Sequence, residues 1–150
     1  MMIEPEKSKT RTASCQCGTL SLVAAGEPDV INICHCAFCQ RRSGSVFSCN
    51  AYFLASAIDV SGTSRSFTRV GSSGRPLRNH FCPECGTTLF WRADLRPNHM
   101  GVAVGAFNDP SFAPPSVSLW ESSIYAWVGI PAGICRFTHA LPSTRPTKER

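Results

Sequence analysis

The sequence has no apolar run that approaches the roughly 20 residues of a membrane-spanning helix. Residues 1–7 contain no apolar core of the kind that a secretory signal peptide requires. Helical patterning is equally scarce, because no long stretch keeps a 3.6-residue hydrophobic period. We therefore expect a cytoplasmic protein with little helix and no membrane partner.

Charge is also scarce, since charged residues make up only 17% of the 150 residues. The net charge of +5 is not concentrated in a basic run with interleaved aromatic residues, so we do not expect a nucleic-acid partner. Hydrophobic residues account for 43% of the chain, and a chain of this length can bury a real core. The composition indicates one globular domain.

Cysteine, in contrast, is abundant, with nine residues. In a protein that is not secreted, such a number is typical of metal ligands rather than disulfides. The odd count agrees with this interpretation, because nine thiols cannot all pair. The spacing of these cysteines is therefore the main functional signal of the sequence.

Short alternating segments separated by turn residues predict a mainly β fold. The clearest segment is 46–53, and the other expected strands are 20–25, 30–33, 58–60, 66–70, 77–81, 87–91, 100–104 and 116–120. A short helical turn is expected at 35–42, ended by Gly44. We predict one β-rich domain over residues 12–142, between a flexible N-terminal tail, 1–11, and a flexible basic C-terminal tail, 143–150.

Two cysteine pairs are each followed by a glycine. They are Cys15-x-Cys17-Gly18 and Cys82-x-x-Cys85-Gly86. Glycine tolerates positive φ, which lets the following amides turn toward the sulfurs. Together the two pairs supply the four ligands of a closed structural zinc site. Spacing alone leaves the pairing open, because Cys36 and Cys39 with the second pair would form a plausible site as well.

The remaining close-set cysteines are Cys34, Cys36 and Cys39, and no glycine follows the last of them. Three protein ligands are the number found at zinc sites that keep a position open for chemistry. The alternative is a second structural zinc whose fourth ligand is Cys49, a histidine or water. We interpret Cys49 as a small core residue, because it lies on the apolar face of its strand.

Several cationic and imidazole side chains accompany the cysteines. Arg41, Arg42 and Arg78 are placed in the sequence to offset thiolate charge or to bind a carboxylate of a substrate. His35 lies inside the central group, but we expect its neighbours to turn it away from a metal. Cys135 is interpreted as a filler of the core or of an interface.

These motifs together resemble the glutathione-dependent formaldehyde-activating enzyme family, which includes the centromere protein V-like domains. The residues that carry the resemblance are the three cysteine motifs already quoted, Gly44-Ser45, Arg78-x-x-Phe81, Thr87 and the segment 105–110. In that last segment Phe107 and Asn108 replace the Leu and Asp of the family pattern. The likeness covers roughly residues 12–140.

The resemblance implies a fold like that of the Mss4-type zinc proteins, with two zinc ions per chain. It implies a structural zinc held by Cys15, Cys17, Cys82 and Cys85. It further implies a second, open zinc held by Cys34, Cys36 and Cys39, which would form the catalytic site. The family's named reaction joins glutathione and formaldehyde to S-hydroxymethylglutathione and is classed as a carbon–sulfur lyase reaction.

Our hypothesis from the sequence is that the second zinc brings a small thiol, such as glutathione, and an aldehyde together. The alternative is a non-catalytic, zinc-stabilised binding module that contacts protein or nucleic acid. The sequence does not determine the oligomeric state or the physiological substrate.

Overall fold

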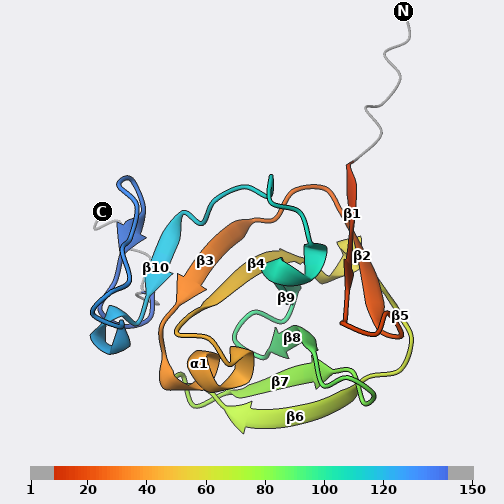
Figure 1. Ribbon diagram of the computed structural model, residues 1–150. Coiled ribbons are helices and arrows are strands. Elements are labelled where there is room, and N and C mark those ends of the chain that lie inside the picture. The colour runs from red at the N-terminus through yellow and green to blue at the C-terminus, as the bar shows by residue number, and fades with distance from the viewer. Residues whose placement is uncertain (1–8, 142–150) are drawn as a thin grey trace, which may run out of the picture.

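The computed structural model describes residues 9–141, which form two β-sheets and a single α-helix (Figure 1). The smaller sheet is antiparallel, with strand order β1 (Thr10–Ser14), β2 (Ser21–Ala25) and β5 (Ile58–Ser61). Within the described part of the chain, no helix is long and apolar enough to cross a membrane. The mainly β fold with little helix that the sequence predicts is confirmed.

The larger sheet has eight strands in the order β11-β10-β3-β4-β9-β8-β7-β6. Their bounds are β3 Val30–Cys34, β4 Ser48–Leu54, β6 Arg65–Val70, β7 Pro76–Phe81, β8 Thr88–Ala93, β9 His99–Ala103, β10 Val117–Leu119 and β11 Cys135–Arg136. The β10 strand pairs parallel with β3 and β11, and every other neighbouring pair is antiparallel. The sheet therefore carries residues from the first and last thirds of the domain side by side.

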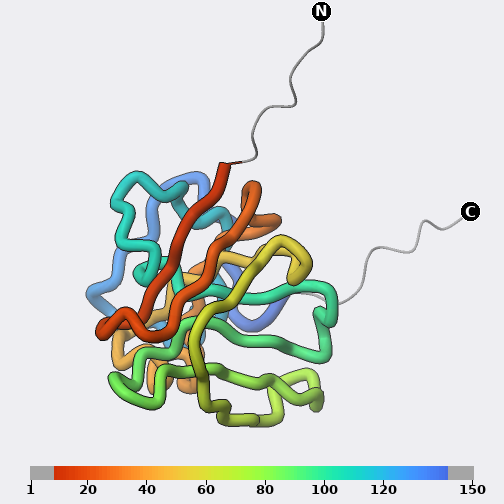
Figure 2. Tube along the Cα trace, turned by 90° about the vertical axis from the view of Figure 1, so that its right-hand side faces the viewer, coloured from red at the N-terminus to blue at the C-terminus, as the bar shows by residue number. Residues whose placement is uncertain are grey.

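The hydrophobic core lies between the two sheets. Figure 2 shows the molecule from the side that the small sheet covers, with β1 and β2 in front of the rest of the chain. The inward residues of this sheet include Leu22 and Ala24, which are almost fully buried, as is Leu20 just before β2. They pack in one cluster with Phe53 and Val102 of the large sheet. Because the small sheet covers this face, the opposite face of the large sheet is left for the site.

The helix α1 (Ala37–Ser43) follows β3 after a short turn. Its N-cap is Cys36, whose Sγ accepts a hydrogen bond from the Cys39 amide at 3.3 Å. It ends at Gly44, which adopts a left-handed conformation with φ of 69° that suits glycine. Three short 3₁₀ helices complete the described elements, η1 (Ala55–Ala57), η2 (Val104–Phe107) and η3 (Glu121–Ser123).

The predicted N-terminal tail is corrected at its end. Residues 1–8 lie outside the described residues, but Thr10 and Arg11 already belong to β1 and pair with β2. The Arg11 side chain donates to the Gly26 carbonyl and pairs with Glu27. Thr10 and Arg11 are polar, so the sequence shows no hydrophobic alternation here that would predict the start of β1. The predicted C-terminal tail, 143–150, lies outside the described residues, and the domain over 12–142 stays a prediction.

Gly101 on β9 makes room for a large aromatic residue on the neighbouring strand. A Cβ atom at this position would lie only 2.1 Å from Trp91 Nε1. Gly101 pairs directly with Trp91 of β8 on one side and with Tyr52 of β4 on the other. The absence of a side chain therefore lets the indole lie across the sheet, where it forms part of the site.

Candidate functional site

The four cysteines of the two glycine-closed turns meet at one point, and we call them the four-cysteine cluster. Their sulfurs lie within 4.8 Å of one another. Cys17 Sγ is 3.6 Å from Cys15 Sγ and 3.6 Å from Cys82 Sγ. The Leu20 amide donates to Cys15 Sγ at 3.3 Å. The β1–β2 and β7–β8 turns are thereby joined across 65 residues of sequence.

These distances fit a tetrahedral metal site. Four sulfurs at about 2.3 Å from a zinc ion lie about 3.8 Å apart, close to the 3.6 Å observed between sulfurs. All four thiols are free, so no disulfide competes for them. The pKa of Cys85 is lowered to about 5, chiefly by hydrogen bonds to the Thr87 side chain and backbone. These hydrogen bonds favour the thiolate form of Cys85, which is the form that binds metal.

The other three cysteines form a second group, the three-cysteine cluster, at the junction of β3 and α1. Cys34 ends β3, Cys36 caps the helix and Cys39 lies in its first turn. Their sulfurs also lie within 4.8 Å of one another, and Cys34 and Cys39 are buried. The turn between strand and helix therefore brings together three thiols that are two to five residues apart in sequence.

The three thiols differ in acidity. Hydrogen bonds from Cys34 and Cys36 hold the pKa of Cys39 well below its usual value, and the nearby Arg42 guanidinium and Ser48 hydroxyl lower it further. The pKa of Cys34 is raised, because its thiol donates to Cys36 and Cys39 and is buried. The Arg42 guanidinium and the Ser48 hydroxyl therefore favour the thiolate form of Cys39.

A cavity of about 470 Å³ adjoins the three-cysteine cluster. Its size lies in the range of small-molecule sites, about 300–1,000 Å³. All three cysteines line it, together with side chains from α1, the large sheet and the β6–β7 hairpin. The cluster is therefore accessible to a ligand of the size of a short peptide.

Arg42 occupies a wall of this cavity in a fixed orientation. Its guanidinium lies 3.7 Å from the centre of the Trp91 ring and donates to Asn50 Oδ1 at 2.9 Å. The Asn50 amide in turn donates to Asn32 Oδ1 at 2.9 Å. Trp91 Nε1 donates to the Tyr52 hydroxyl at 3.1 Å. These residues come from α1 and three strands, and their contacts hold one positive charge beside the sulfurs.

Of the three arginines that the sequence suggests for substrate binding, the fold brings only Arg42 to the cavity. Arg41 and Arg78 are exposed and contribute to neither of the two described cavities. Arg41 lies two residues beyond Cys39, which turns it to another side of the helix. Arg78 follows Leu77, and alternate residues of a strand face opposite sides. The substrate-binding role that the sequence suggests for Arg41 and Arg78 therefore stays a prediction, which neither described cavity supports.

Two other arginines line the cavity, and the sequence analysis does not identify them. Arg69 lies on β6 and Arg75 in the turn before β7. Both lie 30 or more residues beyond Cys39, the last residue of the three-cysteine cluster, in sequence. The alternation of β6 does not identify Arg69 as a site residue, because the sequence does not show which face of the strand meets α1, and Arg75 lies outside the strand.

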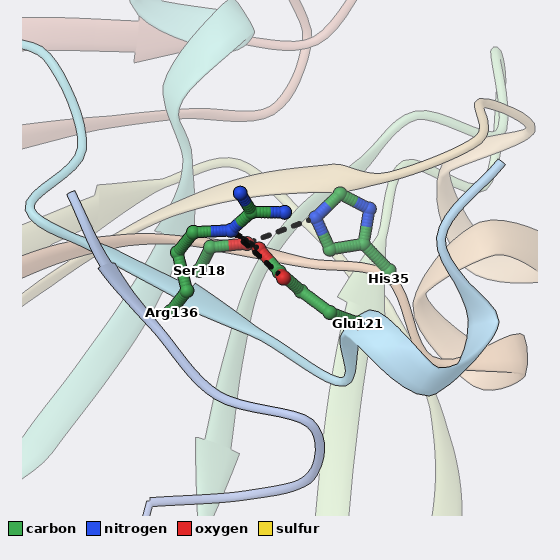
Figure 3. A network of polar contacts seen from close by, with 4 residues as sticks. All are labelled: His35, Ser118, Glu121 and Arg136. Atoms are coloured by element: carbon green, nitrogen blue, oxygen red, sulfur yellow. Dashed lines mark hydrogen bonds and ion pairs between the residues drawn. The ribbon is translucent and has the colours of Figure 1, made fainter. Parts of the chain in front are cut away.

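The His35 side chain takes part in a polar network with Ser118, Glu121 and Arg136 (Figure 3) and does not belong to the three-cysteine cluster. Its Nε2 atom is 3.1 Å from Ser118 Oγ, which donates to Glu121 Oε1 at 2.7 Å. Glu121 also pairs with Arg136 at 2.9 Å. The His35 amide donates to the Leu119 carbonyl. The network ties the loop between Cys34 and Cys36 to β10, η3 and β11.

The two remaining cysteines are outside both clusters. Cys49 is partly buried, packs against the core and lines a second cavity, of about 750 Å³. Burial raises the pKa of its thiol. Cys135 is exposed on β11. Neither belongs to a group of three or more potential ligands among the described residues.

Fold and site define a small β domain with two cysteine clusters, one of which adjoins a cavity. The chain belongs to the glutathione-dependent formaldehyde-activating enzyme family, whose model matches residues 10–123. The match includes all seven clustered cysteines and ends before Arg136.

A relative from Emericella nidulans, provisionally named a glutathione-dependent formaldehyde-activating enzyme, is 24% identical over 90 residues. The match covers 59% of this chain and 45% of the relative, so it spans less than half of that protein. A crystal structure of a Rhodobacter sphaeroides protein is similar in fold, with a TM-score of 0.50 and 21% identity. That likeness covers 69% of this chain and 91% of the other.

Proposed function

We propose that the protein is a zinc-dependent carbon–sulfur lyase that joins glutathione, or a related thiol, to formaldehyde and cleaves the adduct in reverse. The observation that carries the proposal is the cavity of about 470 Å³ lined by all three sulfurs of the three-cysteine cluster. A reaction between small molecules needs such a space beside its metal ligands. Family membership supports the same class of reaction.

The donor chemistry supports zinc at both clusters. Cysteine thiolates select soft or borderline metals, and four of them at tetrahedral spacing are typical of structural zinc. The four-cysteine cluster would hold one ion, and the three-cysteine cluster would hold a second with a coordination position left for a substrate atom. A zinc ion held in this way lowers the pKa of a thiol and polarises a carbonyl oxygen.

The reaction itself sets what the protein side chains must do. In the overall addition, the thiol sulfur bonds to the carbonyl carbon, the carbon–oxygen π bond breaks and the thiol proton is transferred to the oxygen. Arg42 holds a positive charge beside the sulfurs, where it stabilises thiolate. Its contacts with Trp91 and Asn50 keep it there without a carboxylate partner among the described residues.

Tyr52 is suited to donate a hydrogen bond to the carbonyl oxygen. Its hydroxyl oxygen accepts from Trp91 Nε1, while its own proton has no acceptor among residues 9–141. Burial raises the pKa of Tyr52, so that the hydroxyl keeps its proton at neutral pH. The side chain lines the same cavity as the cysteines. A preorganised donor of this kind stabilises the oxygen on which negative charge develops.

The rival interpretation is a non-catalytic binding module stabilised by zinc. Such a module needs the four-cysteine cluster, but it has no need for three further sulfurs in the wall of a cavity. Thiols also add to formaldehyde without a catalyst, so the protein has only a modest barrier to lower. The distinction must therefore be made by comparing rates.

The decisive measurement is exchange spectroscopy of glutathione with formaldehyde, in the presence of wild type, Cys36→Ser or Cys135→Ser. We expect the wild type and Cys135→Ser to accelerate exchange, because Cys135 is outside both clusters. Cys36→Ser should return exchange to the uncatalysed rate. If the folded wild type also gives only the uncatalysed rate, the lyase proposal is wrong and the binding module remains.

A further inference from the structure

The cavity beside the three-cysteine cluster is lined by three arginines and by no acidic residue. Arg42 comes from α1, Arg69 from β6 and Arg75 from the β6–β7 turn. Within residues 9–141, none of the three has a carboxylate at ion-pair distance. Three cationic groups without acidic partners around one cavity attract an anionic ligand.

Arg42 already has a task at the cluster. Its guanidinium is stacked on Trp91 and hydrogen-bonded to Asn50, and its charge lowers the pKa of Cys39. It therefore offsets thiolate charge. The other two arginines, at the β6–β7 hairpin, have no such task.

Arg69 and Arg75 are available to a ligand. The Arg69 guanidinium lies 4.3 Å from the centre of the Phe38 ring, and such stacking leaves the N–H groups at its edge free to donate. Arg75 is exposed in a turn whose backbone is fixed by hydrogen bonds between Gly71 and Arg75 and between Gly74 and Gly71. Neither side chain has a hydrogen-bond partner in the described part of the protein. Figure 1 shows this hairpin beside α1, the helix that carries Phe38 and Arg42.

The rim between the cluster and these arginines is apolar. Phe38, Val70 and Leu95 all line the cavity, and each exposes about half or more of its surface, at 52%, 62% and 52%. A ligand that reaches from the sulfurs to the hairpin would cover these side chains. The cavity thus combines a thiol-binding end, an apolar rim and a cationic wall.

We propose that Arg69 and Arg75 bind carboxylate groups of the thiol substrate, and that they select thiols that carry carboxylates over neutral thiols of similar size. The proposal rests on the proposed function, because the substrate is taken to be a thiol delivered to the three-cysteine cluster. Arg–carboxylate hydrogen bonds are charge-assisted and often bidentate. A neutral thiol would leave both guanidinium groups unpaired in the cavity.

The test is titration calorimetry with S-methylglutathione, which has two carboxylates and no free thiol, and with its dimethyl ester. We expect the wild type to bind the diacid at least about tenfold more tightly than the diester, as two charge-assisted hydrogen bonds would provide. Arg69→Gln/Arg75→Gln should lose this preference. Arg65→Gln, on the same hairpin but outside the cavity lining, should keep it.

The proposal is overturned if the wild type binds acid and ester equally, if it binds neither, or if the double variant keeps the preference. Arg75→Gln alone guards against misfolding of the double variant, because the Arg75 side chain makes no hydrogen bond within the described residues. No formaldehyde is present, so the result is independent of turnover. A preference for the diacid without catalysed exchange would refute the lyase activity alone, and catalysed exchange without the preference would refute the arginine assignment alone.

Discussion

Replacing one cysteine in each cluster should separate their roles. Cys17 and Cys36 form a matched pair, because both are accessible at least in part and neither fills the core. In Cys17→Ser, the link between the β1–β2 and β7–β8 turns loses the sulfur that lies 3.6 Å from both Cys15 and Cys82. In Cys36→Ser, only the junction between β3 and α1 is affected. We expect the first variant to lose far more stability than the second.

The magnitude follows from the length of chain that each cluster closes. The four-cysteine cluster closes a loop across 65 residues, and by the relation used for cross-links this is worth about 4 kcal/mol at 25 °C. The three-cysteine cluster closes a loop of about six residues, worth about 2 kcal/mol by the same relation. In a domain of this size each kcal/mol shifts Tm by about 2–4 °C. Cys17→Ser should therefore lower Tm by about 8–16 °C, and Cys36→Ser by about half as much.

The assay is thermal unfolding followed by circular dichroism, combined with metal analysis of the purified proteins. The wild type should contain about two zinc ions per chain. Cys36→Ser should keep one zinc and a folded domain, whereas Cys17→Ser should lose the zinc of the four-cysteine cluster together with most of its stability. Equal losses of Tm in both variants would refute the division into a structural and an open cluster, as would a wild type that binds a single zinc.

Three other substitutions test single contacts of the site. Ser118→Ala should cost about 1–3 kcal/mol in denaturant unfolding, because it leaves buried His35 without its Nε2 partner. Exposed Ser116→Ala loses only a long 3.5 Å hydrogen bond to the Ile31 carbonyl and should have little effect, so equal costs would contradict this role. Gly101→Ala should displace Trp91 and cost about 1–3 kcal/mol, seen as a changed tryptophan fluorescence, and an unchanged spectrum would contradict the clash. Tyr52→Phe should slow the exchange reaction about tenfold without changing Tm by more than a few degrees, and an unchanged rate would exclude the hydroxyl as a donor.

The strands and the turn cysteines could be predicted because their signals are local. The segment 46–53 alternates, and in the structure Ala51 and Phe53 face the core while Tyr52 lines the cavity. The glycines after Cys17 and Cys85 both adopt positive φ, with values of 80° and 78°. Periodicity and turn chemistry act over a few residues, so they can be read without knowledge of the tertiary fold.

The cationic wall could not be predicted, because it depends on which distant segments the fold brings together. Arg69 lines the cavity from β6, where its guanidinium lies over Phe38 of α1. Arg78 seemed equally well placed in the sequence, yet it faces away from the cavity, since β7 directs Leu77 inward. A residue that is close to a motif in sequence can lie on either face of its strand, and the sequence does not show which face meets α1. The network of His35 with Glu121 and Arg136 depends on tertiary structure in the same way.

Charge explains why the cavity needs arginines at two places, one beside the cysteines and one at the β6–β7 hairpin. Three cysteinates and one divalent cation carry one net negative charge, which would repel both a thiolate and a carboxylate. Arg42, held beside Cys39 by Trp91 and Asn50, offsets that charge locally. It cannot also attract the distant end of a substrate, because Coulomb attraction is weak across a solvated cavity. Arg42 should therefore control the rate of reaction, whereas Arg69 and Arg75 control affinity, so substitutions at the two places should change kcat and KM separately.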